Sequence, residues 1–297
     1  VIREGQPTLV VTAHGTAGAD SYQVGIERGA TTKTIHVDGR PANLPLLAEK
    51  TPIQAISPDT HFAFLSSSRQ RRAVLDWGLF HVEPNYLPHW HDYQRALQQR
   101  NAALKARMSR AVCSAWDQEL VENGETIRKL RDRYLSDIRE RFVEFTGALT
   151  GLSGAEILHK PGWVGESLAN ALTASFEGDY RTGITQSGVH RADMAMSVGG
   201  EAMRERASHG QQKLLVIALR LAQADYFRSE TKKSPVLLVD DLPAELDKAH
   251  RGRLVELISK LGCQVFFTAT DPNLIETSHW NEGAVFHVEP GKIIAAK

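Results

Sequence analysis

The stretch that decides the fold of this chain is Pro235-Val236-Leu237-Leu238-Val239-Asp240-Asp241. A continuous apolar run predicts a strand that is buried on both faces, since a half-buried strand would alternate apolar and polar residues. Because unpaired charge is costly inside a core, Asp240 and Asp241 should lie just past the carboxyl end of this strand. Carboxylates there are typical of a Mg²⁺ site beside a nucleotide phosphate, and they also occur as caps of the next helix. Both interpretations stay open at this point.

Length and composition bound the possible classes of protein. With 297 residues, of which 42% are hydrophobic, the chain can form one large domain or roughly two to three smaller ones. Its 35 basic and 35 acidic residues cancel, so binding to nucleic acid would need a local basic patch. The two cysteines, Cys113 and Cys263, match no metal-binding spacing, and we expect a reduced cytoplasmic protein. No apolar run of about 18 residues and no signal peptide occur, so we expect neither a membrane span nor export.

Hydrophobic patterning divides the chain into three parts, over residues 1–83, 84–182 and 183–297. The first part mixes short strands with turns and then opens a helix near Arg69. In the second part, apolar residues at helical spacing predict two long amphipathic helices packed as an antiparallel pair. The charged run Arg128–Arg133 within them favours a solvated face over a DNA-binding stripe. The third part alternates strands with helices, which is typical of an α/β sheet.

The same patterns place the individual elements. Strands are expected at 8–13, 22–27, 33–37, 52–57, 156–159, 193–198, 235–239, 264–268 and 284–288. Helices are expected between 86 and 146 and at 165–177, 208–227 and 248–261.

A second motif opens the helix that precedes the decisive strand. Ser208 is a good N-cap residue, and Gly210 would let a ligand approach the backbone closely. The free N–H groups and positive dipole end of a helix N-terminus attract phosphate. A plain capped helix would carry the same residues. The order of the motifs favours the phosphate interpretation: Ser-x-Gly-Gln-Gln, a helix, then the apolar strand with two acids, then Glu245-Leu246-Asp247.

That order resembles the signature motif, the Walker B strand and the D-loop of ABC-type ATPases. More narrowly, the chain resembles the RecF family of bacterial DNA replication and repair ATPases, which is related to SMC proteins. The resemblance spans most of the chain and implies an α/β fold: an ABC/SMC-type ATPase head, a mixed β-sheet with flanking helices, and an inserted helical arm. The matching segments are Ser208–Leu215, Ala218–Gln223, Leu238–Asp247, Ser57–Asp59, Arg71–Trp77, Gln99–Leu104, Gly188–Asp193 and Gln264–Ala269.

The resemblance also implies roles for single residues in a site that holds ATP and Mg²⁺. Asp240 would hold Mg²⁺, and Asp241 would orient or deprotonate the attacking water. The first turn of the signature helix would meet the γ-phosphate of the ATP held by a second subunit, and the D-loop would act across the same dimer interface. The residues so assigned are Ser208, Gly210 and Gln211 for the signature helix, Asp247 for the D-loop, and Thr268 for the switch position where many ABC ATPases carry His.

The family's partners follow from the same resemblance. We expect an ATP-dependent homodimer that binds double-stranded DNA and single-strand/double-strand junctions, works with RecR- and RecO-type mediators, and helps load recombinase at single-strand gaps. Candidate phosphate contacts are Arg69, Arg71, Arg72, His190 and Arg191. For each of these five residues, a supporting structural role is an equal alternative.

Two departures from the family pattern limit these expectations. Positions 207 and 209 are Ala and His, where the family usually has Leu and Arg. No Gly-x-x-x-x-Gly-Lys-Ser/Thr phosphate loop occurs, and the only Gly-Lys pair is Gly291-Lys292. In the family that loop precedes the point where this chain begins, so we expect an N-terminally truncated form without ATPase activity of its own. The alternatives are a non-catalytic module that binds DNA or a partner, and another SMC-like head.

Overall fold

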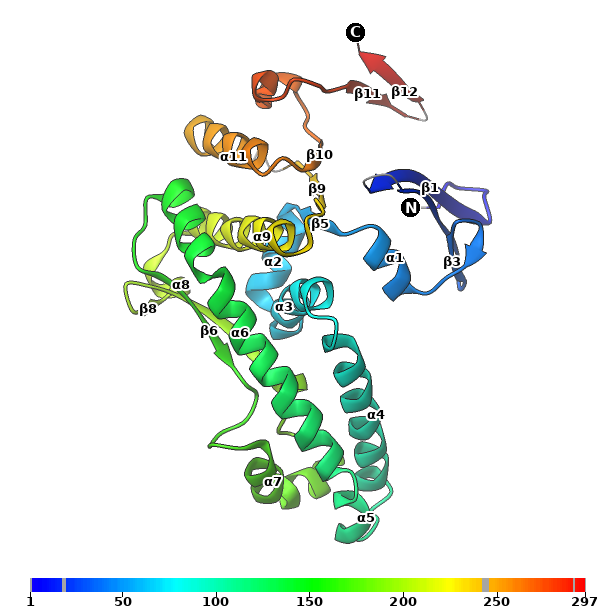
Figure 1. The fold of residues 1–297 in the computed structure, drawn as a ribbon, viewed down its shortest axis with the longest axis vertical. Coiled ribbons are helices and arrows are strands. Elements are labelled where there is room, and N and C mark those ends of the chain that lie inside the picture. The colour runs from blue at the N-terminus through cyan, green and yellow to red at the C-terminus, as the bar shows by residue number, and fades with distance from the viewer. Residues whose placement is uncertain (1, 18–19, 242–245, 291, 297) are drawn as a thin grey trace.

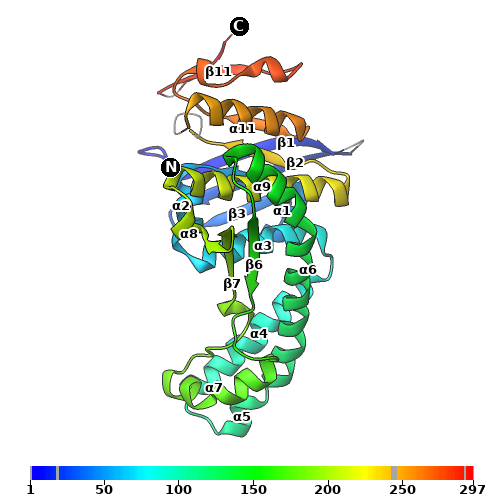
Figure 2. The same ribbon diagram turned by 90° about the vertical axis from the view of Figure 1, so that its left-hand side faces the viewer.

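The computed structural model describes residues 2–17, 20–241, 246–290 and 292–296 of the chain. The molecule is elongated, with both termini in a head at one end and a helical arm that projects from it (Figure 1). Figure 2 shows the molecule turned by 90° about the vertical axis, with the arm extending below the head. No helix in the described part of the chain is both long enough and apolar enough to cross a membrane.

The chain begins with an antiparallel sheet of its own. Its strands follow one another in the order β1-β2-β3-β4, and β1 pairs with β2 along its whole length. This long pairing extends both strands beyond the ranges that the sequence predicts. A small separate core holds the sheet to the short helix α1. The bounds are Thr8–Ala17, Asp20–Gly29, Lys33–Val37 and Arg40–Pro41 for β1 to β4, and Leu44–Lys50 for α1.

A parallel sheet at the centre of the head joins residues from the two ends of the sequence. Its order is β10-β9-β5, with β5 at Ile53–Ile56, β9 at Val236–Val239 and β10 at Gln264–Phe267. Both pairings of β9 are parallel. The helix α9 (His209–Thr231) packs against this sheet. The expected α/β sheet is therefore present, but it recruits a strand from the first part of the chain.

The prediction that the decisive strand is buried on both faces was wrong. Leu237 and Val239 are buried, whereas Leu238 between them is 37% exposed. Its neighbour in register on β10, Phe266, is 54% exposed on the same face. A continuous apolar run shows that both faces of a strand are apolar. It does not show that other elements cover both faces.

The arm is built from two long helices that pack as the predicted antiparallel pair (Figure 1). Residues further along the first helix contact residues nearer the start of the second: His89 contacts Asn123, and Arg100 contacts Asp117. The second helix, α6, is 34 residues long and continues into the head, where it packs against α9. The arm helices are α4 (Tyr86–Lys105), α5 (Arg110–Ser114), α6 (Asp117–Thr150) and α7 (Leu168–Thr182).

A third sheet lies beside α6, and it changes the expected organisation. The strand predicted near 193–198 pairs antiparallel with the one predicted near 156–159, and does not join the parallel sheet. The three-part division of the chain therefore stays a prediction, since α6 and this sheet connect its parts. The elements here are β6 (Ala155–Lys160), η1 (Val189–Arg191), β7 (Asp193–Val198), β8 (Glu201–Ala202) and α8 (Met203–Arg206).

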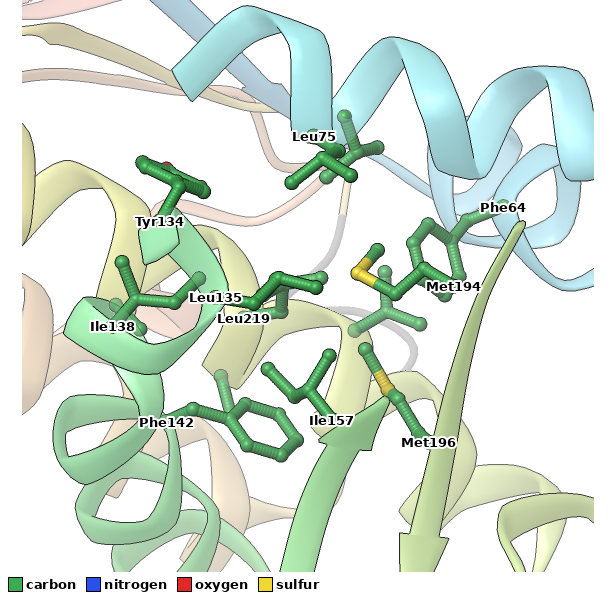
Figure 3. Close-up of a cluster of buried hydrophobic side chains, with 14 of the residues drawn as sticks. Phe64, Leu75, Tyr134, Leu135, Ile138, Phe142, Ile157, Met194, Met196 and Leu219 are labelled. Carbon is green, nitrogen blue, oxygen red and sulfur yellow. The ribbon is translucent and has the colours of Figure 1, made fainter. Parts of the chain in front are cut away.

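The main core forms where α2, α3, α6, α9, β6 and β7 meet. Figure 3 shows Leu75 at the top, Tyr134 and Phe142 of α6 on the left, and Phe64 on the right beside Met194 of β7. The remaining elements are α2 (Pro58–Ser66), α3 (Ser68–Val82), α11 (Lys248–Lys260), the short turns η2 (Pro272–Leu274) and η3 (Thr277–His279), and the hairpin of β11 (Val285–Glu289) with β12 (Lys292–Ala296).

The charged run Arg128–Arg133 is not simply a solvated face, because Arg131 within it is fully buried. Its guanidinium donates to Asp76 of α3 (2.7 Å) and to the carbonyl of Val189 in η1 (2.9 Å). It also lies over the ring of Trp90 in α4. A charge removed from water is tolerated only with such partners. Arg131 therefore fixes the arm helices to the head.

His190 lies beside this junction and is neutral. Its Nε2 donates to the carbonyl of Thr185 (3.0 Å), so its Nδ1 accepts from the hydroxyl of Tyr93 (2.7 Å). Burial, with Arg191, Arg72 and Arg100 nearby, lowers the pKa of His190 to about 4. Burial likewise lowers the pKa of His81 to about 4.

These two histidines predict how stability depends on pH. In the unfolded chain they bind protons near pH 6.5, but in the folded chain only near pH 4. Stability is therefore complete above about pH 6.5 and falls as the pH drops toward 4. For His190 alone the loss between pH 7 and pH 5 should be on the order of 1–2 kcal/mol. Urea unfolding at a series of pH values measures it.

His190→Gln should flatten this pH dependence, because glutamine keeps hydrogen-bonding groups but does not titrate. The matched control is His91→Gln, which changes an exposed histidine of α4. An unchanged slope in His190→Gln would contradict the neutral, buried assignment.

Candidate functional site

The two acids of the decisive stretch lie where the sequence places them, at the carboxyl end of β9. The backbone N–H of Asp240 donates to Ile56 at the end of β5 (2.9 Å). On the other side, the N–H of Thr268 donates to Val239 (3.0 Å). The parallel sheet thus holds Asp240 between two strand ends. Both Asp240 and Asp241 are exposed to solvent.

Thr268 connects the two acids. Its hydroxyl donates to Oδ1 of Asp240 (2.5 Å) and accepts from the backbone N–H of Asp241 (3.0 Å). Asp241 has φ +49°, a left-handed conformation that is uncommon for a residue with a Cβ but that Asp tolerates. The hydroxyl of Thr268 therefore fixes the turn that presents the carboxylate of Asp241. Among the described residues, that carboxylate has no hydrogen-bond or ion-pair partner.

The first turn of α9 begins with a capping box. The N–H of Gln211 donates to the hydroxyl of Ser208 (3.3 Å), and the N–H of Ser208 donates to Oε1 of Gln211 (3.0 Å). This capping box satisfies two helix-end groups reciprocally. Ala207 is buried below it, and His209 is exposed.

Gly210 has no structural reason to be glycine within the described fold. It is helical, without a positive φ, and a Cβ built on it meets no atom within 4 Å. Glycine in a helix costs about 1 kcal/mol relative to alanine. A glycine that lowers helix stability and has open space around it would let a ligand approach the backbone closely.

Asp247 lies in the predicted D-loop, and its carboxylate caps α11. It accepts from the N–H groups of Ala249 (2.9 Å) and His250 (3.0 Å), and it contacts Nδ1 of His250 (2.5 Å). The backbone N–H of His250, followed by its side chain, lowers the pKa of Asp247. Asp247 is exposed as well. Glu245 of the same motif lies outside the described residues.

The five candidate DNA contacts fall into two groups. Arg71 donates to both carboxylate oxygens of Asp193 (2.6 and 2.9 Å), and Arg72 donates to the carbonyl of Ala192 (2.7 Å). Arg71 and Arg72 thus join α3 to the segment from η1 to β7, and His190 joins η1 to α4, which favours a supporting role for all three. Arg69 and Arg191 are exposed and make no such contact within the described chain.

The site thus brings Asp240, Asp241 and Thr268 together at the carboxyl end of β9. Within the described chain, no hydrogen bond or ion pair joins them to the signature residues of α9. No group of three or more His, Cys, Asp or Glu side chains among the described residues could hold a metal alone. Sequence patterns did not reveal that Thr268 bridges the acids, because this contact depends on the register of β10 against β9.

Comparison with known proteins agrees with this architecture. Residues 11–293 match the family model described as RecF/RecN/SMC N terminal domain. The DNA replication and repair protein RecF of Thioalkalivibrio sulfidiphilus (strain HL-EbGR7) is 37% identical over 287 residues, which cover 96% of this chain and 80% of that protein.

Two solved structures share the fold. A structure of the recombination mediator protein RecF-ATPrS in the RecFOR pathway has a TM-score of 0.83 at 23% identity, covering 99% of this chain and 81% of that one. The Smc head domain of Pyrococcus furiosus, with an extended coiled coil and bound to the C-terminal domain of ScpA, has a TM-score of 0.53 at 14% identity, covering 98% and 77%. The predicted fold class, an α/β head of ABC/SMC type with a helical arm, is confirmed. By its sequence match along almost its whole length, this chain belongs to the RecF family.

Proposed function

We propose that this chain carries the Walker B and signature part of an ATP-dependent DNA-binding protein of RecF type, which acts in recombinational repair and replication restart at single-strand gaps and helps load recombinase. Membership of the family, whose curated members are named DNA replication and repair protein RecF, supports the role in replication and repair. The observation that carries the ATP-dependent part is the bridge from Asp240 through Thr268 to Asp241.

The residues at this bridge suit magnesium and a nucleotide phosphate. Mg²⁺ is usually held by one or two carboxylates together with phosphate oxygens and water, so a complete protein cage is not needed. Asp240 would supply that carboxylate, and bound Mg²⁺ would neutralise phosphate charge. Asp241, exposed and without a partner in the described chain, is free to orient a water or accept its proton.

The lengths of the elements support a site divided between two subunits. The helix α9 has 23 residues, about 34 Å, and returns over the sheet into β9, whose four residues span about 13 Å. Its first turn therefore extends well past the end of β9 in the same chain. A phosphate at Asp240 would then meet the Ser208 helix of a second copy, which is the basis for proposing an ATP-dependent homodimer.

Turnover by this chain alone tests the first part of the proposal. These 297 residues contain no phosphate loop, so no backbone cradle or Lys holds the β- and γ-phosphates. We expect phosphate release from magnesium-ATP at the background rate, equal to that of Asp241→Asn. Hydrolysis above background that Asp241→Asn removes would show that the chain is a complete enzyme.

The substitution Gly210→Ala distinguishes an effect on the stability of the fold from an effect on the phosphate site. In this chain it should raise the free energy of unfolding by up to about 1 kcal/mol, because no atom opposes the new methyl group. The matched control is Gly252→Ala in α11, a second exposed helical glycine with open space around it. Chemical denaturation should show similar gains for both.

The same pair tests the divided site when a phosphate loop is present, for example in a fusion with the amino-terminal segment of a RecF relative. There, Gly210→Ala should weaken ATP-dependent dimerisation about tenfold in light scattering, while Gly252→Ala leaves it unchanged. Equal dimerisation of both variants would contradict a role for Gly210 at the partner's phosphate.

DNA binding is supported by one basic region between α3 and β7. Arg69 and Arg191 are exposed and flank the contacts that Arg71 and Arg72 make to β7. Lys160, opposite Asp193 in register, adds a third exposed cation. Unpaired guanidinium groups on one surface are suited to phosphate contacts that position DNA.

Double charge reversal, Arg69→Glu with Arg191→Glu, should weaken binding to a gapped DNA duplex by at least about tenfold and leave the melting temperature unchanged. The contrasting variant is Arg71→Ala, which should lose about 1–3 kcal/mol of stability because Asp193 loses its partner. Fluorescence anisotropy and thermal melting measure the two effects. If the double variant binds DNA with the affinity of the wild type, this surface does not contact DNA.

The proposal also covers the location of the protein and its partner proteins. It comprises a cytoplasmic location and RecR- and RecO-type mediators as partners. The second candidate function, a non-catalytic module that binds DNA or a partner, is favoured by the missing phosphate loop. Background turnover combined with DNA binding that ATP does not change would select it.

A further inference from the structure

The far end of the arm carries four exposed cations that come from three elements. Lys105 ends α4, Arg107 follows it, Arg110 begins α5, and Arg181 lies in the last turn of α7. We call these residues the arm tip, which Figure 1 shows at the end opposite the head. Over the whole chain, basic and acidic residues balance. The arm tip is therefore a local concentration of positive charge.

Contacts at the surface hold two of these cations in place. Arg107 donates to the carbonyls of Tyr180 and Arg181 and lies over the Tyr180 ring. Arg110 lies over the ring of Phe176, 4.5 Å from its centre. A small separate core, with Leu104, Cys113 and Phe176 buried, supports them. Two of the guanidinium groups are thus placed before any partner arrives, which reduces the entropy lost on binding.

Two acids near the arm tip are already paired with another cation. Asp117 and Asp179 both pair with the buried Arg100 (2.7 and 2.8 Å). Within the described chain, no ion pair involves Lys105, Arg110 or Arg181. Cations at helix ends complement the helix dipole, which explains Lys105 and Arg181. Arg107 likewise satisfies the last carbonyls of α7, but no helix C-terminus explains Arg110, which begins α5.

Exposed apolar side chains lie among these charges. Met108 is 47% exposed, Val112 45% and Ile184 43%. Ile184 follows Gly183, whose Cβ position would lie 3.1 Å from the side chain of Lys105. Met108 accepts a weak contact at its carbonyl from the thiol of Cys113, directly under the surface. Exposed apolar and basic side chains are therefore interspersed along residues 105–112 and 181–184.

We propose that the arm tip is a docking surface for an acidic peptide segment of a partner protein that also carries apolar side chains. The cations complement its carboxylates, and Met108, Val112 and Ile184 receive its apolar groups. Methionine adapts well to such contacts. Nucleic acid phosphates would use the cations and leave the apolar side chains without a function. The inference is independent of the ATP site, which lies in the head.

The test uses this chain without nucleotide and a fluorescein-labelled peptide of alternating aspartate and leucine. Anisotropy should show binding that Lys105→Glu with Arg181→Glu weakens by about tenfold or more. The matched charge control is Lys129→Glu with Arg139→Glu, which changes two exposed cations of α6 that make no described ion pair. It should leave the affinity within about twofold.

Two further comparisons separate apolar recognition from charge alone. Ile184→Ser should weaken the peptide about fivefold, while Leu158→Ser, at an equally exposed leucine of β6, should have no effect. A peptide of alternating aspartate and serine should bind about tenfold more weakly than the leucine peptide.

Three outcomes would overturn the proposal. They are no binding of the leucine peptide, equal binding by wild type and the arm-tip double variant, and equal affinity for the leucine and serine peptides. If the double variant instead loses affinity for a short DNA duplex and keeps it for the peptide, the arm tip is a nucleic acid surface. Thermal melting of each variant verifies that it is folded.

Discussion

The buried guanidinium of Arg131 is the interaction on which the joint between arm and head depends. It lies at the middle of α6 and holds Asp76 of α3, the carbonyl of Val189 in η1 and the ring of Trp90 in α4. Removing one partner from a buried charge costs several kcal/mol, so these four elements cannot separate independently. The neutral His190 lies next to Val189 at the same junction.

Much of the fold could be predicted because periodicity depends only on local residue order. Helical spacing indicated the antiparallel pair of the arm. The apolar run before Asp240 and Asp241 indicated a strand with two acids at its carboxyl end. Burial of charge could not be predicted in this way. Arg128 and Arg131 belong to one charged run, yet only Arg131 is fully buried, because α6 turns that face toward α3 and η1.

The geometry of the candidate site depends on contacts between distant residues. Thr268 reaches Asp240 and Asp241 because Phe267 pairs with Val239 in the parallel ladder, and no local pattern contains that register. The exposed face around Leu238 and Phe266 was missed for the same reason: covering a strand needs elements from elsewhere in the chain. The types of residue therefore predicted which chemical groups form this site, but not how those groups contact one another.

The continuity of α6 has a mechanical consequence. Its 34 residues form one uninterrupted rod of about 51 Å, gripped by α9 at one end and by α4 at the other. A tilt of about five degrees at the α9 contact displaces the opposite end by about 4 Å, which is comparable to the rise of one helical turn. Packing inside the head, down to the contacts of Arg131, therefore sets where the far end of the arm lies.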